Sequence, residues 1–441
     1  MKNNRWYISV LILLTSITYV CAQGWPQYLG PSRDGTSSQK GILRTWPANG
    51  PEVLWTANLG VGYGGPVAID GKVYILDRDD KTGDIMRCLD LNNGTEVWKF
   101  AYDAPGSVMF PGSRSVPALD GNYVYSCGPY GDLYCIDINT HQPVWNKNVW
   151  KDFGGQQIPT WAISQCPLVY GDILLLASQA PEAGVVAYNK LNGNLVWKTL
   201  SLGAVGYVSP ALVKVSGEDQ VVMITATAGG GFGQTGSGGK VVGISPATGK
   251  ILWEYSNWQC RIPIPSAVDA GDNKILITGG YEAGTAMIKI EKKGDGSYTV
   301  EELFKTPDFG SHTQAPLLIN GNFYAQYSTN ERKDGLVCMG MDGTIKWKTG
   351  REPGFDKGGM ISADGVLIAT DGMTNLYLID PDPSSFKMIT SAELLQQGAT
   401  SGEANASRAG GATQNWAPIA LIDGKLLIRD QGRMLCIKVA Q

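Results

Sequence analysis

The stretch Thr248–Trp253 reads Thr-Gly-Lys-Ile-Leu-Trp, a tight turn followed by two apolar residues and a tryptophan. A phrase of the same kind returns about every 50 residues, which is the spacing of repeat proteins. Such a period predicts that each repeat forms one supersecondary unit that stacks on its neighbours. Further copies of the phrase end at Trp98, Trp145, Trp197 and Trp347.

Each repeat also places a short turn signal between two apolar runs. Asx-Gly pairs in such a setting favour two-residue hairpin turns, because those turns need positive φ. The flanking runs are rich in Val, Ile, Leu and Tyr, as half-buried strands prefer. We therefore expect antiparallel sheets, with each tryptophan on an outer strand and packed between neighbouring units rather than serving as a ligand platform. The turn signals are Asp70-Gly71, Asp120-Gly121, Gly171-Asp172, Gly271-Asp272, Asn320-Gly321, Asp364-Gly365 and Asp423-Gly424.

Small residues or proline open each unit, and these openings count eight units. The last unit ends at Gln441 with three strands, and Pro51–Trp55 can supply the fourth. Pairing the two chain ends leaves no raw sheet edge at the seam. The sequence thus predicts an all-β, eight-bladed β-propeller of four-stranded antiparallel blades over residues 51–441, closed by an N-terminal strand. The openings are Gly64-Gly65-Pro66, Ser115-Val116-Pro117, Gln165-Cys166-Pro167, Val208-Ser209-Pro210, Pro265-Ser266-Ala267, Gln314-Ala315-Pro316, Gly358-Gly359-Met360 and Trp416-Ala417-Pro418.

Residues 1–22 have the pattern of a secretory signal peptide. Lys2 and Arg5 precede the apolar run Tyr7–Leu14, and Val20-Cys21-Ala22 offers small residues for cleavage. The run is too short to span a membrane comfortably. We expect a periplasmic or extracellular protein with a leader segment over residues 23–50. The alternatives are an uncleaved anchor and a lipoprotein with Cys21 as the lipid acceptor.

Composition argues against several function classes. The net charge of −4 becomes −6 without Lys2 and Arg5, and no basic patch stands out, so nucleic acid is not an expected partner. Two histidines give little material for a histidine metal site, and we expect none. There is no CxxCH haem motif.

Four cysteines share one position of the repeat. A common place inside an apolar strand predicts small buried fillers, with disulfides as the alternative. The four are Cys88, Cys135, Cys338 and Cys436.

The stretch Gly243–Trp253, with its apolar strand and Thr-Gly-Lys-x-x-Trp ending, resembles the PQQ-like eight-bladed propellers. That family includes quinoprotein alcohol dehydrogenases and the outer-membrane assembly factor BamB. Trp25–Gly35 also resembles a leader found in secreted bacterial PQQ-like proteins. For the dehydrogenases the resemblance implies pyrroloquinoline quinone (PQQ), calcium, a stacking tryptophan, a vicinal disulfide and a catalytic aspartate. This chain has no adjacent cysteine pair. No cofactor is therefore expected, and PQQ with calcium remains the alternative.

Residues just before the eight strand openings should converge at one end of the central channel, where ligands favour concave surfaces. Arginine and lysine there suit an anionic group, and aromatic rings suit a flat ring or a sugar face. The alternative is that these side chains only line the channel or face solvent. The predicted ligand-binding residues are Tyr63, Arg114, Gln165, Tyr207, Arg261, His312, Gln314, Lys357 and Trp416, with Trp161 and Trp258 slightly upstream.

Three functions stay open from these residues. The sequence favours a monomeric, non-catalytic ligand-binding or protein-interaction scaffold, whose partner is an envelope protein, a small molecule or a glycan. The alternatives are a PQQ-dependent oxidoreductase acting on alcohols or sugars, and a carbohydrate-binding or carbohydrate-active protein. A fold of this kind hosts many functions, so the choice depends on the site.

Overall fold

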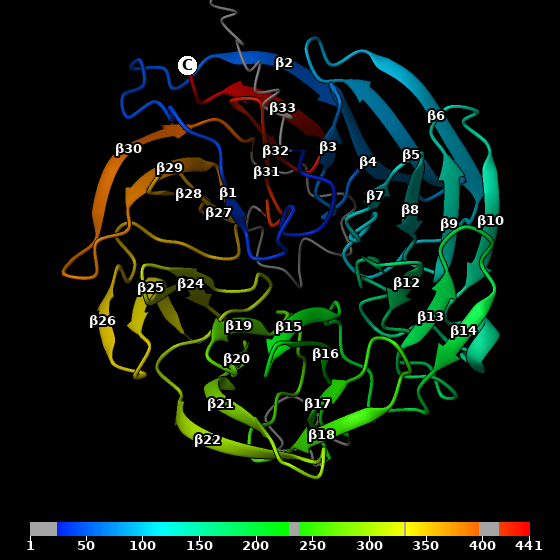
Figure 1. Ribbon diagram of the computed structural model, residues 1–441. Coiled ribbons are helices and arrows are strands. Elements are labelled where there is room, and N and C mark those ends of the chain that lie inside the picture. The colour runs from blue at the N-terminus through cyan, green and yellow to red at the C-terminus, as the bar shows by residue number, and fades with distance from the viewer. Residues whose placement is uncertain (1–23, 229–237, 330–331, 397–413) are drawn as a thin grey trace, which may run out of the picture.

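The computed structural model describes residues 24–228, 238–329, 332–396 and 414–441, and the predicted signal peptide with Cys21 lies outside the described residues. Eight sheets are arranged as blades around a central axis (Figure 1). The predicted eight-bladed, all-β propeller is confirmed. Within the described ranges the helical content is one 3-10 turn, Lys151–Phe153, and no helix there is long and apolar enough to cross a membrane.

The blades follow chain order, each from its innermost to its outermost strand. Blades 1 and 2 comprise β3 (Val67–Ile69), β4 (Lys72–Asp79), β5 (Gly83–Asp90), β6 (Glu96–Asp103) and β7 (Ala118–Asp120), β8 (Tyr123–Cys127), β9 (Asp132–Asp137), β10 (Pro143–Asn148). Blades 3 and 4 comprise β11 (Leu168–Tyr170), β12 (Ile173–Leu176), β13 (Val186–Asn189), β14 (Leu195–Lys198) and β15 (Ala211–Val215), β16 (Glu218–Ile224), β17 (Val241–Ile244), β18 (Ile251–Tyr255).

The second half of the ring repeats this order. Blades 5 and 6 comprise β19 (Val268–Gly271), β20 (Lys274–Gly279), β21 (Gly284–Lys292), β22 (Tyr298–Thr306) and β23 (Leu317–Ile319), β24 (Asn322–Ser328), β25 (Lys333–Gly340), β26 (Ile345–Lys348). Blades 7 and 8 comprise β27 (Met360–Ala363), β28 (Val366–Thr370), β29 (Asn375–Asp380), β30 (Lys387–Glu393) and β31 (Ala420–Ile422), β32 (Lys425–Arg429), β33 (Arg433–Lys438), β2 (Val53–Asn58).

Blade 8 joins the two ends of the chain, as the sequence predicts. Strand β2 pairs antiparallel with β33, and Trp55 lies opposite Cys436 in the register. Each blade therefore has four antiparallel strands, to which the sheet of blade 7 adds a fifth, parallel strand from the leader. The seam presents no unpaired edge inside the sheet. The ring has two ends, which we name by their connections. The turn face carries the Asx-Gly turns between the first and second strands, and the loop face carries the segments that open each blade.

The repeated tryptophans pack between blades, which confirms their predicted role. The Trp145 indole N–H donates to the carbonyl of Lys190 in the next blade at 3.0 Å. Gly193 packs against the indole of Trp145, and a Cβ at this glycine would lie 2.7 Å from the indole. The same indole–carbonyl bond is made by Trp55 to Leu91 and, in further blades, by Trp197 to Pro246 and Trp347 to Asp382.

The cysteines of the repeat fill the narrow space beside these rings. Cys88 lies between Tyr74 on one neighbouring strand and Trp98 on the other. All seven cysteines in the described ranges are buried and free, so the prediction of buried fillers is confirmed. A small side chain is required there because its neighbours on both sides are large aromatic rings.

The leader segment lies inside the ring, which the sequence does not predict. Trp25 forms an antiparallel bridge with Ala68 on the innermost strand of blade 1, and the Leu119 amide of blade 2 donates to the Pro26 carbonyl at 2.8 Å. The Arg33 guanidinium donates to the carbonyls of Pro167 and Pro210, at the openings of blades 3 and 4. Backbone and side-chain groups of the leader thus bind the inner strands of several blades.

The leader then returns towards the turn face. Strand β1 (Thr36–Ser37) runs parallel to β27 of blade 7, near the axis in Figure 1. Beyond it, the amides of Gly41 and Ile42 donate to the carboxylate of Asp364, a residue of an Asx-Gly turn. The segment from Trp25 to Ser37 is therefore a plug that enters and leaves the channel at the turn face.

The tryptophan packing predicts how a turn glycine responds to a methyl group. Gly193 and Gly71 have φ of 70° and 71°, but only Gly193 faces an indole, and nothing lies within 4 Å of a Cβ at Gly71. We expect Gly71→Ala to lower the free energy of unfolding by about 1 kcal/mol, the cost of a left-handed alanine. Gly193→Ala should cost at least about 2 kcal/mol because the blade contact is also strained. Urea unfolding measures both, and equal losses would contradict the packing role of Trp145.

Candidate functional site

The predicted binding residues all precede an innermost strand, so they lie at the loop face around the axis. Their charges and rings interact from blade to blade. Arg114 of blade 2 is close enough to influence the ionisation of Tyr63 and Tyr207, and Lys357 influences that of His312. The structure therefore brings residues from separate blade openings into one continuous group, which we call the loop-face cluster.

The centre of the loop-face cluster on blades 7, 8 and 1 is Trp416. The Lys357 ammonium lies 4.6 Å from the centroid of its ring and 2.7 Å from Oδ1 of Asp356. The Trp416 indole N–H donates to Oδ2 of the same carboxylate at 3.2 Å. Tyr63 packs on Trp416 at 5.7 Å between ring centroids. The ion pair is partly accessible, since the side chains of Lys357 and Asp356 are 11% and 21% exposed.

Burial sets the ionisation of two members of this group. It lowers the pKa of the Lys357 ammonium, while Asp356 acts in the opposite direction. It also raises the pKa of Tyr63 to about 12. The Tyr63 hydroxyl is consequently neutral, and it donates to the side-chain oxygen of Gln414 at 2.8 Å.

Arg114 does not present a free guanidinium to a ligand. It donates to the carbonyls of Trp161, Met109 and Phe110, and burial lowers its pKa to about 10. These bonds hold the segment before the innermost strand of blade 2 so that Phe110 reaches Tyr63 and Trp416, at 6.2 and 5.8 Å between centroids. Arg114 thus orders the loop. Its N–H donors point to backbone carbonyls rather than to a position where an anionic ligand would bind.

Two predicted residues are buried ties between blades. Gln165 donates to the carbonyl of Gly206 in the next blade at 3.0 Å, and Gln314 donates to the carbonyl of Trp416 at 3.0 Å. Tyr207 is also buried, and its hydroxyl accepts the Trp161 amide while the two rings meet edge to face at 5.5 Å. These three side chains position the cluster more than they face solvent.

Blades 5 and 6 contribute a stack of three side chains. The Arg261 guanidinium lies 5.1 Å from the Tyr281 ring centroid, and Tyr281 meets His312 edge to face at 4.6 Å. His312 is 7% exposed, and its Nδ1 lies 3.5 Å from the Ser328 carbonyl. Burial, with the nearby charge of Lys357, lowers the pKa of His312 to about 3. The imidazole is therefore neutral.

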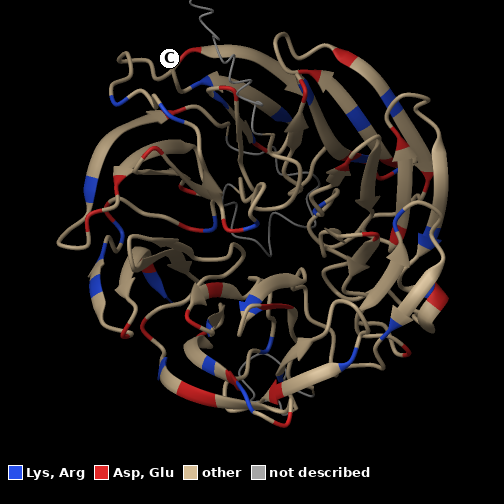
Figure 2. Cartoon of the chain, in the orientation of Figure 1, with Lys and Arg blue, Asp and Glu red and all other residues tan. Residues whose placement is uncertain are grey.

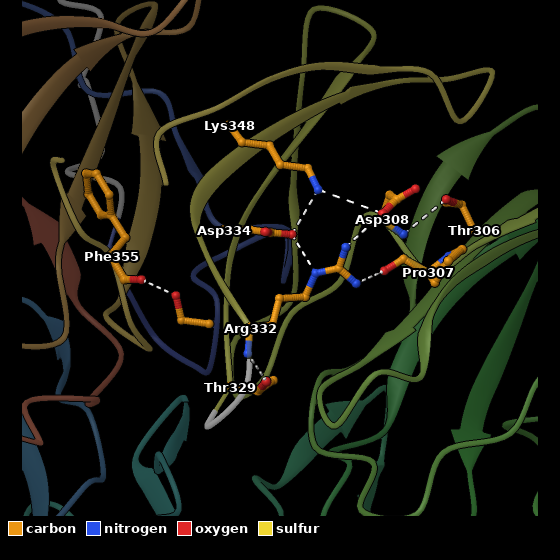
Figure 3. Close-up of polar contacts among 9 residues, drawn as sticks. Thr306, Pro307, Asp308, Thr329, Arg332, Asp334, Lys348 and Phe355 are labelled. Atoms are coloured by element: carbon orange, nitrogen blue, oxygen red, sulfur yellow. Dashed lines mark hydrogen bonds and ion pairs between the residues drawn. The ribbon is translucent and has the colours of Figure 1, made fainter. Parts of the chain in front are cut away.

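An ion-pair network joins blades 5 and 6 (Figure 3). Arg332 donates to Asp334 at 2.6 Å within blade 6 and to Asp308 at 2.7 Å on blade 5. Lys348 joins the same two carboxylates. Ser328 bonds onward to the Phe355 carbonyl of blade 7 at 2.6 Å. These bonds connect blades 5, 6 and 7 beside the cluster. Elsewhere around the ring, positive and negative side chains are interspersed (Figure 2).

Sequence reasoning missed Phe110 and Tyr281 as members of the cluster. Both are brought in by backbone with positive φ, 60° at Phe110 and 52° at Tyr281, which no composition signal marks. Trp258, in contrast, is 2% exposed and belongs to the core, where its N–H donates to the Ala283 carbonyl. It is not part of the site.

Left-handed backbone occurs at bulky residues of the loop face and also in the plug, at Leu29 and Arg33. On the turn face such positions hold mainly Asp or Asn, which tolerate that conformation. At the loop face they hold Phe110, Ala162, Gln179, Tyr281 and Glu282. Residues of these types pay about 1–3 kcal/mol for positive φ, and such strain clusters at functional sites.

The donor set does not fit the metal-dependent quinone site that the dehydrogenase resemblance implies. Within the described ranges, no group of three or more His, Cys, Asp or Glu side chains could hold a metal ion. The sequence has no adjacent cysteine pair, and the described cysteines are free. The rings around Trp416 are tilted by 33° and 48° rather than parallel, so they do not form a slot for a flat cofactor.

Comparison with known proteins gives matches of two kinds. A family model described as outer membrane protein assembly factor BamB matches residues 81–349. Quinoprotein alcohol dehydrogenase PedH of Pseudomonas putida is 27% identical over 176 residues, which are 37% of this chain and 26% of that protein. BamB of Bordetella pertussis is 27% identical over 212 residues, 47% of this chain and 46% of that protein. The chain thus matches about a quarter and about half of the length of these relatives.

Solved structures agree on the fold alone. Quinohemoprotein alcohol dehydrogenase from Comamonas testosteroni is similar with a TM-score of 0.61 at 12% identity, over 95% of this chain and 81% of that chain. A europium-containing methanol dehydrogenase has a TM-score of 0.58 at 12% identity, over 92% and 90% of the two chains.

The neutral His312 predicts a pH dependence of stability. Its pKa is lowered on folding, so the unfolded state binds the proton more readily; the stabilisation is complete above pH 6.5 and is lost as the pH falls towards about 3. The loss should reach about 1.4 kcal/mol per pH unit. Urea unfolding at pH 7.5 and 5.0 should show a smaller decrease in His312→Asn than in the unmodified protein. Identical decreases in both proteins would contradict the buried, neutral imidazole.

Proposed function

The chain belongs to the PQQ-like β-propeller family described by the outer membrane protein assembly factor BamB model, and from this premise we propose that it is a non-catalytic binding propeller outside the cytoplasm. Its loop face would be the binding face. The observation that carries the proposal is the loop-face cluster, in which polar and aromatic side chains from separate blades meet around one end of the axis.

The asymmetry of the ring supports this choice of face. The plug Trp25–Ser37 enters the channel from the turn face and binds inner strands through backbone bonds, and its Arg33 reaches the openings of blades 3 and 4. The loop face has left-handed backbone at Phe110 and Tyr281, two bulky residues for which that conformation is strained. Strain of this kind persists only where surrounding contacts enforce it, which is typical of a functional surface.

Extracytoplasmic location is part of the proposal. The signal-like pattern of residues 1–22 supports it, as does the name of the matched family, which refers to the outer membrane. Lipid attachment at Cys21 remains the alternative to a freely soluble mature protein, and both fit an envelope partner or a ligand.

A PQQ-dependent oxidoreductase is the second candidate, favoured by the similarity to quinoprotein alcohol dehydrogenase PedH over 176 residues. The described side chains do not fit that cofactor, because they offer neither a carboxylate-rich metal site nor a vicinal disulfide. Stoichiometric retention of PQQ with calcium, together with dye reduction by alcohols or aldoses, would favour this candidate over a binding propeller.

The binding face can be mapped with a photo-crosslinking amino acid in living cells. Met109 lies beside Phe110 on the loop face and is 44% exposed, while Val144 lies on the outer strand β10 and is 46% exposed. We expect p-benzoylphenylalanine at position 109 to give a discrete adduct by mass spectrometry, because a bound partner or ligand would cover that residue.

Val144 provides the matched control, since its exposure is similar to that of Met109 but it lies on the outside of the ring. Adducts from position 144 and none from position 109 would place binding on the rim and contradict the proposal.

A further inference from the structure

Two cations of the loop-face cluster already have partners within the protein. Arg114 is bound to three carbonyl oxygens, and Lys357 is paired with Asp356 at 2.7 Å. A ligand with a full negative charge would have to compete with these partners. The Asp356–Lys357 pair carries no net charge, so this part of the cluster favours a neutral ligand.

The Asp356–Lys357 pair offers an acceptor and a donor side by side. Asp356 keeps acceptor capacity on both oxygens after bonding Lys357 and Trp416, and the ammonium of Lys357 has donors beyond the one used by Asp356. The two polar atoms are separated by roughly the distance between neighbouring hydroxyl oxygens of a sugar ring. A vicinal diol can donate to the carboxylate and accept from the ammonium at once.

The aromatic rings around this pair suit a saturated ring better than a flat one. Phe110, Trp161 and Trp416 are all partly exposed. Phe110 and Trp416 are tilted by 48°, and Trp161 meets Tyr207 at 83°. In neither pair are the two rings parallel, so neither pair forms a slot that could hold a flat molecule between its rings. A single ring can still pack against the C–H face of a pyranose.

We propose that the Asp356–Lys357 pair beside Trp416 recognises a neutral glycan, binding a vicinal diol of a pyranose whose apolar face packs on the exposed rings of the loop-face cluster. This inference rests on the proposed role of the loop face in binding. Arg114 is a positioning residue in this account, because it holds Phe110 against Tyr63 and Trp416.

Calorimetric titration with neutral hexasaccharides of glucose, mannose, galactose and N-acetylglucosamine tests the proposal. At least one should bind, and Lys357→Met should weaken its binding by about tenfold or more, as expected for losing a charged hydrogen bond. Asp356→Asn should weaken it similarly. Lys214→Met is the matched control, since Lys214 forms an ion pair of the same 2.7 Å with Asp219 near the turn face; that variant should retain full affinity.

Thermal unfolding of each variant separates a binding effect from a folding defect, and Lys357→Arg, which keeps the charge, should restore part of the affinity. Binding of none of the neutral hexasaccharides, binding of a galacturonate hexamer alone, or equal losses in Lys357→Met and Lys214→Met would overturn the proposal. Failure of the glycan proposal can be distinguished from failure of the proposed binding face. A protein adduct at position 109 would support binding at the loop face while contradicting a glycan ligand.

Discussion

The contact on which the ring depends is the one between an outer-strand tryptophan and the turn of the next blade, as at Trp55, Trp145 and Trp197. It joins a buried indole N–H to a carbonyl and a flat ring to a turn residue without a side chain, as Trp145 does with Lys190 and Gly193. A four-stranded blade has two faces, and each must be covered by a neighbour. A closed ring covers all of them, provided that the last blade can be completed, and the pairing of Trp55 opposite Cys436 completes it.

The plug makes the two ends of this ring different. At the turn face, Trp25 and β1 complete hydrogen bonds along inner strands that would otherwise offer free edges to the channel. At the loop face, the openings of the blades carry the aromatic and polar side chains that meet around Trp416. Asp and Asn occupy most left-handed positions of the turns, whereas bulky residues such as Phe110 and Tyr281 occupy left-handed positions in the cluster. The proposed binding face is therefore the end opposite to the one at which the plug enters.

The blades could be predicted from the sequence because their signals are local and repeated. Three local signals predict the fold. The Asx-Gly turns indicate hairpins, a small residue such as Cys88 opposite a tryptophan indicates packing between strands, and the spare strand at Trp55 indicates closure of the ring. The convergence of the blade openings follows from the same geometry. What each side chain does there could not be predicted, since Arg114 is bound by carbonyls of a loop whose course depends on positive φ at Phe110. The place of the leader depends on contacts with distant blades, such as Arg33 with Pro210, that no local pattern encodes.

The central claim is that the leader seals the turn face and leaves the loop face for binding. Hydrogen–deuterium exchange of the full chain tests it most directly. Peptides that cover Trp25–Ser37 should stay protected for as long as those of β4 and β24, because the Trp25 amide is bonded to the Ala68 carbonyl at 2.7 Å within the ring. Complete exchange of the leader within seconds, with the blades still protected, would contradict the account.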